Sequence, residues 1–464
     1  MALNIPQEFV EKYNRPGPRY TSYPTVPVWD TNFGEDDYRA ALTDLKGLPE
    51  DEIALYLHLP FCAKACHFCA CNMIIDHGKS AVETYLDRVE RELSLVIDII
   101  GTGRKVSQFH WGGGTPNFLN EKETERALRM FETAFDFTPD AEISLEIDPR
   151  IGSPEQAAFF KDVGFNRISL GVQDFDARTQ KAIGRNQSRE RTLKVYHGCR
   201  DAGFEGVNID LVYGLPGQTR ESFERTLHDL IAIEPDRVAC FSYAHVPWVR
   251  PNQDRVDTTI MLEGYDKFQL FMLTVDLFQE ADYKWIGIDH FAKSSDELSV
   301  ALDNKILHRN FMGYATKPAP HMLAFGMSGI SDVCGRFVQN ASSMTPWEEA
   351  VDAGKMPIIK GLKLDEDDLM RREIILNLMC NLVLPWDSTE KAWGKPANEI
   401  LAKSLPALDP LIADGLCLVD DHGLHITEKG RYFVRNVAMT MDAYLGDGAK
   451  NKDQGDRVIF SNTI

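Results

Sequence analysis

Short runs of hydrophobic residues recur along the first half of the chain and alternate with longer amphipathic segments. The strand-like runs lie at 53–59, 106–111, 142–148, 167–172, 207–213 and 237–243. Between them, segments such as 81–98 and 121–135 place apolar residues at helical spacing. A spacing of about 30–50 residues per unit is typical of repeated βα units, so the pattern predicts an α/β fold with a parallel sheet or partial barrel.

The two ends of the chain have a different pattern. The beginning is rich in Pro, Tyr and charge and carries one amphipathic segment near 35–46. Near the other end, 365–384 has a helical period, and 412–445 is typical of a helix, a short hairpin and a second helix. We therefore expect an N-terminal arm at 1–50, a barrel with its extension at 51–360, and a small, mainly helical, wing-containing C-terminal domain at 361–464.

Composition narrows the class of protein. The chain has 464 residues, of which 44% are hydrophobic, and a net charge of −20. No long basic run is present, so a nucleic-acid partner is not expected. The start has no signal-peptide pattern, and the apolar runs fall short of the roughly 18 residues typical of a membrane span. We expect a soluble cytoplasmic protein that acts as a monomer.

Four of the nine cysteines lie within ten positions, at Cys62, Cys66, Cys69 and Cys71, and the others are scattered. An odd, mostly scattered set does not favour a secreted disulfide framework. A structural zinc site usually pairs two C-x2-C knuckles, and the sequence has no second knuckle. The C-x3-C-x2-C spacing of the first three on a loop after a strand favours a [4Fe–4S] cluster with one open iron.

This spacing after the first barrel strand makes the chain resemble the radical SAM enzymes. Ten motifs narrow the resemblance to the oxygen-independent coproporphyrinogen III oxidases, nearly end to end. In order they are PGPRYTSYPT (16–25), FCAKACHFCACN (61–72), HWGGGTP (110–116), EIDPR (146–150), GVQDF (171–175), NIDLVYGLP (208–216), YAHVP (243–247), IDHFA (288–292), LHRNF (307–311) and RNVAM (435–439).

The resemblance implies a cofactor arrangement. It implies that Cys62, Cys66 and Cys69 hold a [4Fe–4S] cluster whose open iron binds S-adenosylmethionine (SAM), and that two SAM molecules occupy the site. Reductive cleavage of SAM would then supply a 5′-deoxyadenosyl radical. The SAM contacts that the resemblance implies are Tyr56, Phe68, Gly113, Gly114, Thr115, Glu146, Gln173, Arg185, Asp210, Ala244 and Ile330.

Two of these motifs allow a further interpretation from the residues themselves. The glycines of HWGGGTP do not fit a phosphate-binding loop. Such a loop would add a Lys and begin a helix, whereas Pro116 follows these glycines. Alternation in 142–148 points Glu146 into the barrel, where a buried carboxylate needs a partner. That partner is a SAM amino group or ribose, or alternatively an internal salt bridge with Arg150. Gln173 and Asp210 lie near strand ends, where barrel enzymes place their sites.

The implied substrate, coproporphyrinogen III, carries four carboxylates. Arg19 is the candidate to bind a propionate, because a guanidinium matches a carboxylate bidentately, and Tyr20 is a candidate to cover the macrocycle. The alternative for this segment is a proline-braced surface arm. The role of Cys71 stays open between a structural or second-layer residue and thiol chemistry. Met312 and Ala70 depart from the Gln and Gly that are common in the family.

The activity implied is oxidative decarboxylation of the ring A and B propionates to the vinyl groups of protoporphyrinogen IX, in anaerobic haem biosynthesis. It requires an electron donor and an electron acceptor, neither of which the sequence identifies. One alternative is a haem-binding, chaperone-like radical SAM protein without decarboxylase activity. Another is a methyltransferase or haem-degrading enzyme on the same scaffold.

Overall fold

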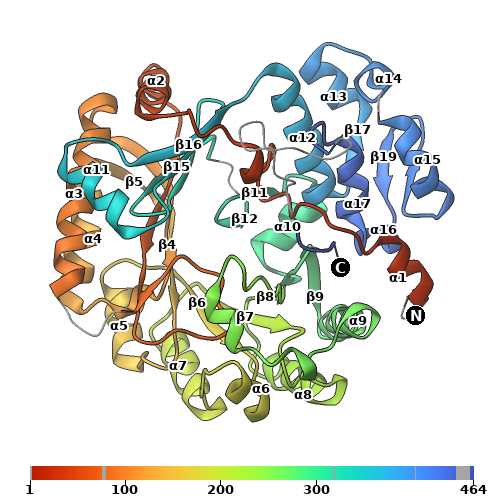
Figure 1. Cartoon of the computed structure of the whole chain (residues 1–464), viewed down its shortest axis with the longest axis horizontal. Coiled ribbons are helices and arrows are strands. Elements are labelled where there is room, and N and C mark those ends of the chain that lie inside the picture. Colours follow the sequence, from red (N-terminus) through yellow and green to blue (C-terminus); the bar gives the residue numbers. More distant parts are fainter. Residues whose placement is uncertain (1–2, 76–79, 317–318, 403, 446–459, 464) are drawn as a thin grey trace. The chain divides into compact units, whose positions relative to one another are not determined.

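The computed structural model describes residues 3–75, 80–316, 319–402, 404–445 and 460–463 (Figure 1). Contacts between residues divide the chain into two compact units, each described here by itself. Unit 1 comprises Met1–Trp29, Leu262–Pro318 and Leu364–Ile464, and unit 2 comprises Asp30–Met261 and Ala319–Lys363.

Unit 2 is built on a mainly parallel sheet that contains all six predicted strands. Its parallel series runs in the order β1 (Ile53–Leu59), β4 (Arg104–Gly113), β5 (Phe135–Ile147), β6 (Arg167–Gln173), β7 (Gly206–Tyr213) and β8 (Arg237–Ser242). Beyond β1 the sheet continues with β13 (His321–Phe325), parallel to β1, and then the antiparallel β14 (Ile330–Val333), β15 (Arg336–Asn340) and β16 (Ile358–Lys363). The expected α/β partial barrel is confirmed.

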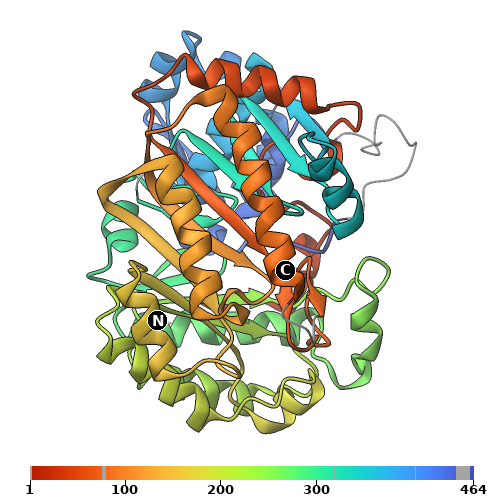
Figure 2. The ribbon, with the colours of Figure 1, turned by 90° about the vertical axis from the view of Figure 1, so that its left-hand side faces the viewer.

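Helices return the chain between the parallel strands, as the helical spacing predicts. They are α3 (Ser80–Ile100), α4 (Glu121–Ala134), α5 (Pro154–Asp162), α6 (Ala177–Ala182), α7 (Arg189–Asp201) and α8 (Arg220–Ile231). The orange α3 and α4 cross in front of the strands in Figure 2. The start of α4 is fixed by a capping box, in which Asn120 and Glu123 each accept the other's backbone N–H.

The remaining elements of unit 2 are shorter or lie outside this series. They are α2 (Glu35–Lys46), β2 (Phe61–Cys62), β3 (Ile74–Ile75), α11 (Met344–Asp352), and the 3-10 turns η2 (Pro116–Phe118), η3 (Pro251–Arg255) and η4 (Thr258–Ile260). The bounds of α2 agree with the predicted amphipathic segment.

The two faces of the parallel strands differ in burial. On β6, Leu170 and Val172 are fully buried, whereas Ser169 and Gly171, which alternate with them, are only half-buried. The same alternation occurs on β7, where Asn208 and Asp210 are half-buried. One face therefore packs under helices and carries the apolar residues, and the opposite, polar face remains reachable by solvent.

Unit 1 combines the ends of the chain with a middle segment. Its elements are α1 (Gln7–Tyr13), η1 (Val26–Val28), α9 (Gly264–Glu280), β9 (Tyr283–Gly287), β10 (His290–Lys293), α10 (Glu297–Asp303), β11 (His308–Asn310), β12 (Gly313–Ala315), α12 (Glu366–Asn381), β17 (Val383–Pro385), α13 (Trp386–Trp393), α14 (Ala397–Ile400), α15 (Leu405–Ala413), β18 (Cys417–Val419), β19 (Gly423–Ile426), α16 (Glu428–Arg431), α17 (Val434–Ala438) and η5 (Met439–Met441). The β18–β19 hairpin lies between α15 and α16.

The N-terminal arm is held by the other end of the chain. Arg435 is 8% exposed, and its guanidinium donates to the carbonyls of Gly17 and Pro18 and to those of Asn462 and Thr463. Much of the polar tail, residues 446–459, lies outside the described residues and includes most of the RVIF hook.

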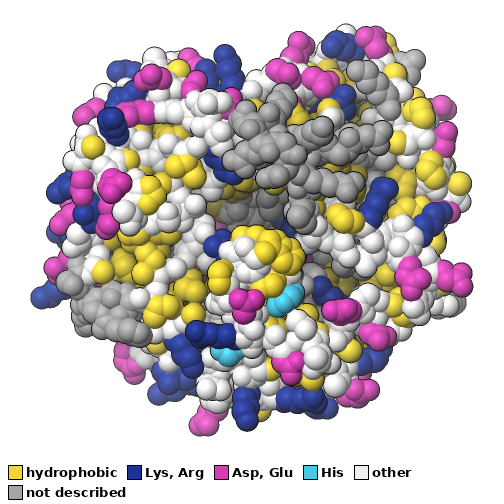
Figure 3. Space-filling model, in the orientation of Figure 1, with side chains coloured by type: hydrophobic (Ala, Val, Ile, Leu, Met, Phe, Trp, Pro, Cys, Tyr) yellow, Lys and Arg dark blue, Asp and Glu magenta, His cyan; other side chains and the backbone are white. Residues whose placement is uncertain are grey.

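The surface agrees with the charge pattern of the sequence. On the face shown in Figure 3, acidic and basic side chains are interspersed and form no continuous basic stretch. Within the described residues, no helix has the length and apolar character needed to cross a membrane.

Candidate active site

The cysteine-rich segment, residues 60–72, is called the cysteine loop. It follows β1 at the carboxyl end of the parallel strands, and it is held by a segment after β8. The side-chain amide of Asn252 donates to the carbonyls of Cys66 (3.1 Å), His67 (3.2 Å) and Cys69 (2.9 Å). Gln253 donates in the same way to the carbonyl of Phe68 at 2.8 Å. These bonds fix the backbone that presents the sulfur atoms.

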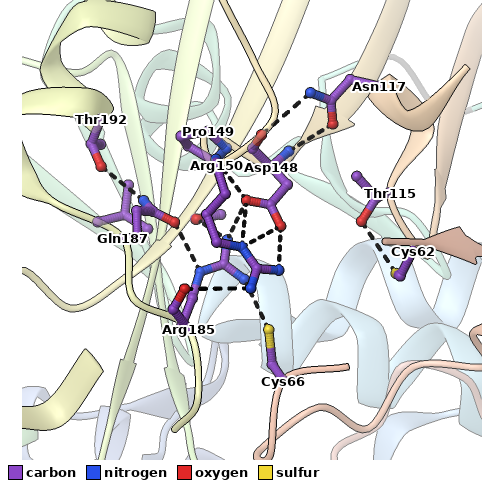
Figure 4. Close-up of polar contacts among 12 residues, drawn as sticks. Cys62, Cys66, Thr115, Asn117, Asp148, Pro149, Arg150, Arg185, Gln187 and Thr192 are labelled. Atoms are coloured by element: carbon purple, nitrogen blue, oxygen red, sulfur yellow. Dashed lines mark hydrogen bonds and ion pairs between the residues drawn. The ribbon is translucent and has the colours of Figure 1, made fainter. Parts of the chain in front are cut away.

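Each of the three predicted ligand sulfurs has a polar neighbour. The Sγ of Cys62 lies 3.2 Å from the hydroxyl of Thr115. The Sγ of Cys66 accepts a hydrogen bond from the guanidinium of Arg185 at 3.4 Å, as Figure 4 shows. The Sγ of Cys69 accepts one from the backbone N–H of Cys71 at 3.4 Å. Donors of this kind stabilise thiolates, the form that binds metals.

The thiols differ in their acidity. Burial raises the pKa of Cys62 to about 12, against a smaller lowering effect of the Thr115 hydrogen bond. Hydrogen bonds from Cys71, its thiol foremost, lower the pKa of Cys69 to about 7. The same thiol–thiol bond raises the pKa of Cys71. Cys71 therefore serves Cys69 as a hydrogen-bond donor, a role that sequence reasoning left open.

The arrangement suits a polynuclear cluster. Within the described ranges, no group of three or more His, Cys, Asp or Glu side chains converges as on a single ion. Thiolates on a [4Fe–4S] cube bind different irons and need no such convergence. Three sulfurs on one loop, each beside a hydrogen-bond donor, fit that donor set. The residues that would hold the cluster are Cys62, Cys66 and Cys69.

The glycine motif brings the end of β4 against the cysteine loop. A Cβ on Gly114 would lie 2.5 Å from the carbonyl of Pro60, and one on Gly113 would lie 2.5 Å from the ring of His58. Gly113 also has a φ of 113°, in the range that favours glycine. The glycines are required here by close packing within the chain, and this packing places Thr115 beside Cys62.

Glu146 lies on the polar face of the sheet with His110 and the backbone N–H of Gly113. The His110 ring lies 3.5 Å from its carboxylate, and the Gly113 N–H donates to it at 3.4 Å. Burial raises the pKa of Glu146, but the hydrogen bond and charge of His110 outweigh burial and lower it below its usual value. Glu146 is therefore anionic near neutral pH. Arg150, its suggested alternative partner, pairs with Asp148.

Asp210 lies on the same face, and its pKa is shifted in the opposite direction. Ser169 donates to its carboxylate at 3.1 Å. Burial, followed by the negative charge of Glu146, raises the pKa of Asp210 to about 7. These two predicted residues are therefore carboxyl groups of different proton affinity on one face of the sheet.

Sequence reasoning missed His58, which lies on β1. Its ring nitrogens lie 3.1 Å from the hydroxyl of Tyr56 and 2.8 Å from the carbonyl of Asn72. Burial lowers the pKa of His58, so the ring is neutral. It links a predicted SAM contact to the cysteine loop, and no spacing pattern in the sequence marks a single histidine of this kind.

The other predicted residues are placed as follows. In unit 2, Gln173 ends β6 with a φ of 72°, Ala244 lies two residues after β8, and Ile330 begins β14. In unit 1, Arg19 is half-buried. Tyr20 is 1% exposed and donates to Asp442 at 3.0 Å, so it is a core residue in this structure. The roles of these residues in binding stay predictions.

Comparisons with known proteins agree with this geometry. Residues 56–230 match the Radical SAM superfamily, and residues 364–433 match the HemN C-terminal domain. The oxygen-independent coproporphyrinogen III oxidase of Synechocystis sp. is 40% identical over 98% of this chain and 97% of its own. That of Escherichia coli is 39% identical over 97% of each.

A solved structure agrees as well. It is described as coproporphyrinogen III oxidase (HemN) from Escherichia coli, a radical SAM enzyme. It superposes with a TM-score of 0.91 at 36% identity, over 96% of this chain and 100% of that one.

Proposed function

Because this chain belongs to the oxygen-independent coproporphyrinogen III oxidases, a family of radical SAM enzymes, we propose that it converts coproporphyrinogen III to protoporphyrinogen IX by oxidative decarboxylation. The ring A and B propionates become vinyl groups. The observation that carries this proposal is 40% identity over 98% of the chain and 97% of a relative with this name. The haem-binding alternative is not favoured, because the full-length relatives cited carry the oxidase name.

The cofactors proposed are a [4Fe–4S] cluster on Cys62, Cys66 and Cys69, and SAM. When bound, they would supply the chemistry of a 5′-deoxyadenosyl radical for hydrogen abstraction at the propionate β-carbon. The chain's own residues position and shield these groups. Asn252 holds the cysteine loop, and Thr115 contacts the first cysteine.

Several features support SAM binding on the polar face of the sheet. The anionic Glu146 offers an acceptor for an amino group or a ribose hydroxyl, and the hydroxyl of Tyr56 lies at the same face beside His58. The family resemblance implies two SAM molecules, which we also propose. The full set of proposed contacts is Tyr56, Phe68, Gly113, Gly114, Thr115, Glu146, Gln173, Arg185, Asp210, Ala244 and Ile330.

Unit 1 offers cations for the substrate's carboxylates. Burial, and after it the nearby charge of Arg19, lower the pKa of Lys267 to about 8. Arg309 is 8% exposed and donates to the carbonyl of Arg19 at 3.4 Å. Partly or fully buried cations that repel one another are stabilised by an incoming anion. We assign Arg19 as a propionate contact, with Lys267 and Arg309 beside it and Tyr20 next to it in the chain.

The reaction needs an electron donor for the cluster and an acceptor for the electron released by each decarboxylation. We propose that the enzyme acts as a cytoplasmic monomer. A reducing compartment is supported by the described cysteines, all of which are free thiols.

The test is an anaerobic turnover assay. The protein is reconstituted with iron and sulfide, reduced, and given SAM and coproporphyrinogen III, and products are followed by mass. We expect two CO₂ losses per substrate, coupled to 5′-deoxyadenosine. Cys66→Ala should lose iron and activity, whereas Cys334→Ser, on the turn between β14 and β15, should keep both. SAM cleavage without decarboxylation of this substrate would overturn the substrate assignment.

A further inference from the structure

Two arginines that share one aspartate lie beside the sulfur of Cys66. Asp148 follows the end of β5, and Arg150 follows two residues later. The Arg150 Nε lies 2.9 Å and 3.0 Å from the two oxygens of the Asp148 carboxylate. Arg185 approaches the same carboxylate at 3.3 Å, and its other terminal nitrogen donates to Cys66 at 3.4 Å. Figure 4 shows the Arg150 and Arg185 side chains at the Asp148 carboxylate, with the contact from Arg185 to the Cys66 sulfur.

These charges are removed from bulk water. The side chains of Arg150, Asp148 and Arg185 are 17%, 9% and 6% exposed. Asp148 is therefore held as an anion by two cations, and the triplet has a formal charge of +1. The Cys66 sulfur also interacts with Arg150 through charge and a hydrogen bond. A buried net charge acts on its neighbours with little screening.

The triplet is fixed in place by neutral groups. Asn117 accepts from the backbone N–H of Asp148 at 2.9 Å. Arg185 donates to Gln187 at 2.9 Å, and Gln187 donates to Thr192 at 2.8 Å. Arg185 also donates to the carbonyl of Gly171. Because these bonds satisfy the donors and acceptors around the charges, the positive charge needs no rearrangement to act on Cys66.

We propose that the Asp148–Arg150–Arg185 triplet sets the reduction potential of the cluster bound through Cys66. The inference rests on the proposed function, which places a cluster on that thiolate. Reduction adds one electron to the cluster from an external one-electron reductant and breaks no bond. Positive charge and hydrogen bonds at a ligand sulfur stabilise the more negative, reduced form. Arg150 acts through Cys66 and is a positioning residue.

Substitution of Arg150 tests this role separately from SAM binding. Arg185 is one of the proposed SAM contacts, so its substitution would change two functions together. Arg150 is outside that set, and its strongest contacts are with Asp148. An effect of Arg150 on the cluster measured without SAM therefore reports on the charge of the triplet.

The experiment uses two variants that change the charge in opposite directions. Arg150→Gln removes one positive charge, and Asp148→Asn removes the negative one. Both are reconstituted, assayed for iron and sulfide, and titrated anaerobically without SAM, with the reduced cluster followed by electron paramagnetic resonance. We expect Arg150→Gln to lower the equilibrium constant for reduction about tenfold and Asp148→Asn to raise it about tenfold, each equivalent to ~59 mV.

Two further variants guard against damage to the fold. Arg150→Lys keeps the charge, and its reduction equilibrium should stay within about threefold of the parent. Arg200→Gln breaks a part-buried ion pair with Asp236 and should leave the potential unchanged. If Arg150→Gln binds too little iron to titrate, the shifts of Asp148→Asn and Arg150→Lys decide the question.

The outcomes are distinct. Shifts of opposite sign at full iron content support the proposal. Shifts of the same sign, or no shift in either variant, overturn it. If the parent protein binds no cluster in the reconstitution step, that result would instead overturn the proposed function itself.

Discussion

Thr115 and Cys62 lie 53 residues apart in the sequence, and the Thr115 hydroxyl is 3.2 Å from the Cys62 sulfur. The contact joins the turn after β4 to the cysteine loop after β1. It involves the thiol whose pKa burial raises to about 12. Metal binding requires the thiolate, so this hydroxyl favours the form that the cluster needs.

We predict that Thr115→Val weakens cluster binding. A hydrogen bond to a charged group contributes about 1.5–3 kcal/mol, so release of iron to a chelator should be about tenfold faster. Thr115→Ser keeps the hydroxyl and is the matched control. Equal iron release from Val and Ser variants would show that the hydroxyl has no part in holding the cluster.

A second prediction concerns the backbone of the cysteine loop. Asn252→Ala removes an amide that donates to the carbonyls of Cys66, His67 and Cys69. We expect a lower melting temperature for the apo-protein by a few degrees and faster loss of iron from the loaded protein. Asn32→Ala, on an exposed turn, should change neither. An unchanged iron-release rate in Asn252→Ala would contradict the role given to this amide.

A third prediction concerns pH. Glu92 on α3 is 3% exposed and accepts from Gly326, Asn340 and Trp347. Burial raises its pKa to about 7, although these hydrogen bonds lower it. The folded state therefore binds a proton more readily than the unfolded state. The resulting stabilisation is present below the usual carboxyl pKa and is lost as the pH rises through about 7.

The measurement is the melting temperature of apo-protein between about pH 5 and 8, compared with Glu92→Gln. We expect the variant to show a smaller decrease of melting temperature with rising pH, because the titrating group is absent. Glu90→Gln, two residues earlier on the same helix and exposed, should follow the parent. A parallel pH profile in Glu92→Gln and the parent would mean that Glu92 does not titrate in this range.

Substrate binding provides a fourth prediction. Lys267→Gln and Arg19→Gln each remove a cation from the group that we assign to the propionates. We expect KM for coproporphyrinogen III to rise about tenfold in each, since a charge-assisted pair contributes about 1.5–3 kcal/mol. In the parent, KM should also rise above about pH 8, where Lys267 loses its proton.

The control for this prediction is SAM cleavage without substrate, reduced chemically. It should stay within about twofold of the parent, because the substituted residues are neither proposed cluster ligands nor proposed SAM contacts. Lys305→Gln, also in unit 1, should leave KM unchanged. Loss of substrate-free SAM cleavage in Lys267→Gln would point to a structural role for Lys267.

The strands were predicted well from the sequence, because polar and apolar residues alternate along a strand according to which of its two faces is buried. Ser169 and Leu170 alternate on β6 as the pattern requires. Arg150, suggested only as an alternative partner for Glu146, pairs instead with Asp148. Glu146 lies within β5, whereas Asp148 lies beyond the end of the strand. A strand end, which decides the direction of the next side chains, is poorly marked in a sequence.

Long-range partners were not predictable. Asn252 and Cys66 are 186 residues apart, and only the βα order of the barrel brings their loops together. The hydrogen-bond partner of Tyr20 is likewise distant: Asp442 lies 422 residues away. The three cysteines proposed as ligands could be named from the sequence because they lie on one loop, where their spacing carries the information.

The hydrogen bonds between the N-terminal arm and Arg435 have a consequence for folding during translation. Arg19 is made among the first residues, yet Arg435, which binds the neighbouring Gly17 and Pro18, follows more than 400 residues later. Ribosomes add about 5–20 residues per second, so the nascent arm spends on the order of 20–80 seconds without this anchor. Unit 1 is assembled from three separate segments and can close only near the end of translation, so a stalled or truncated product would carry the cysteine loop without an anchored arm.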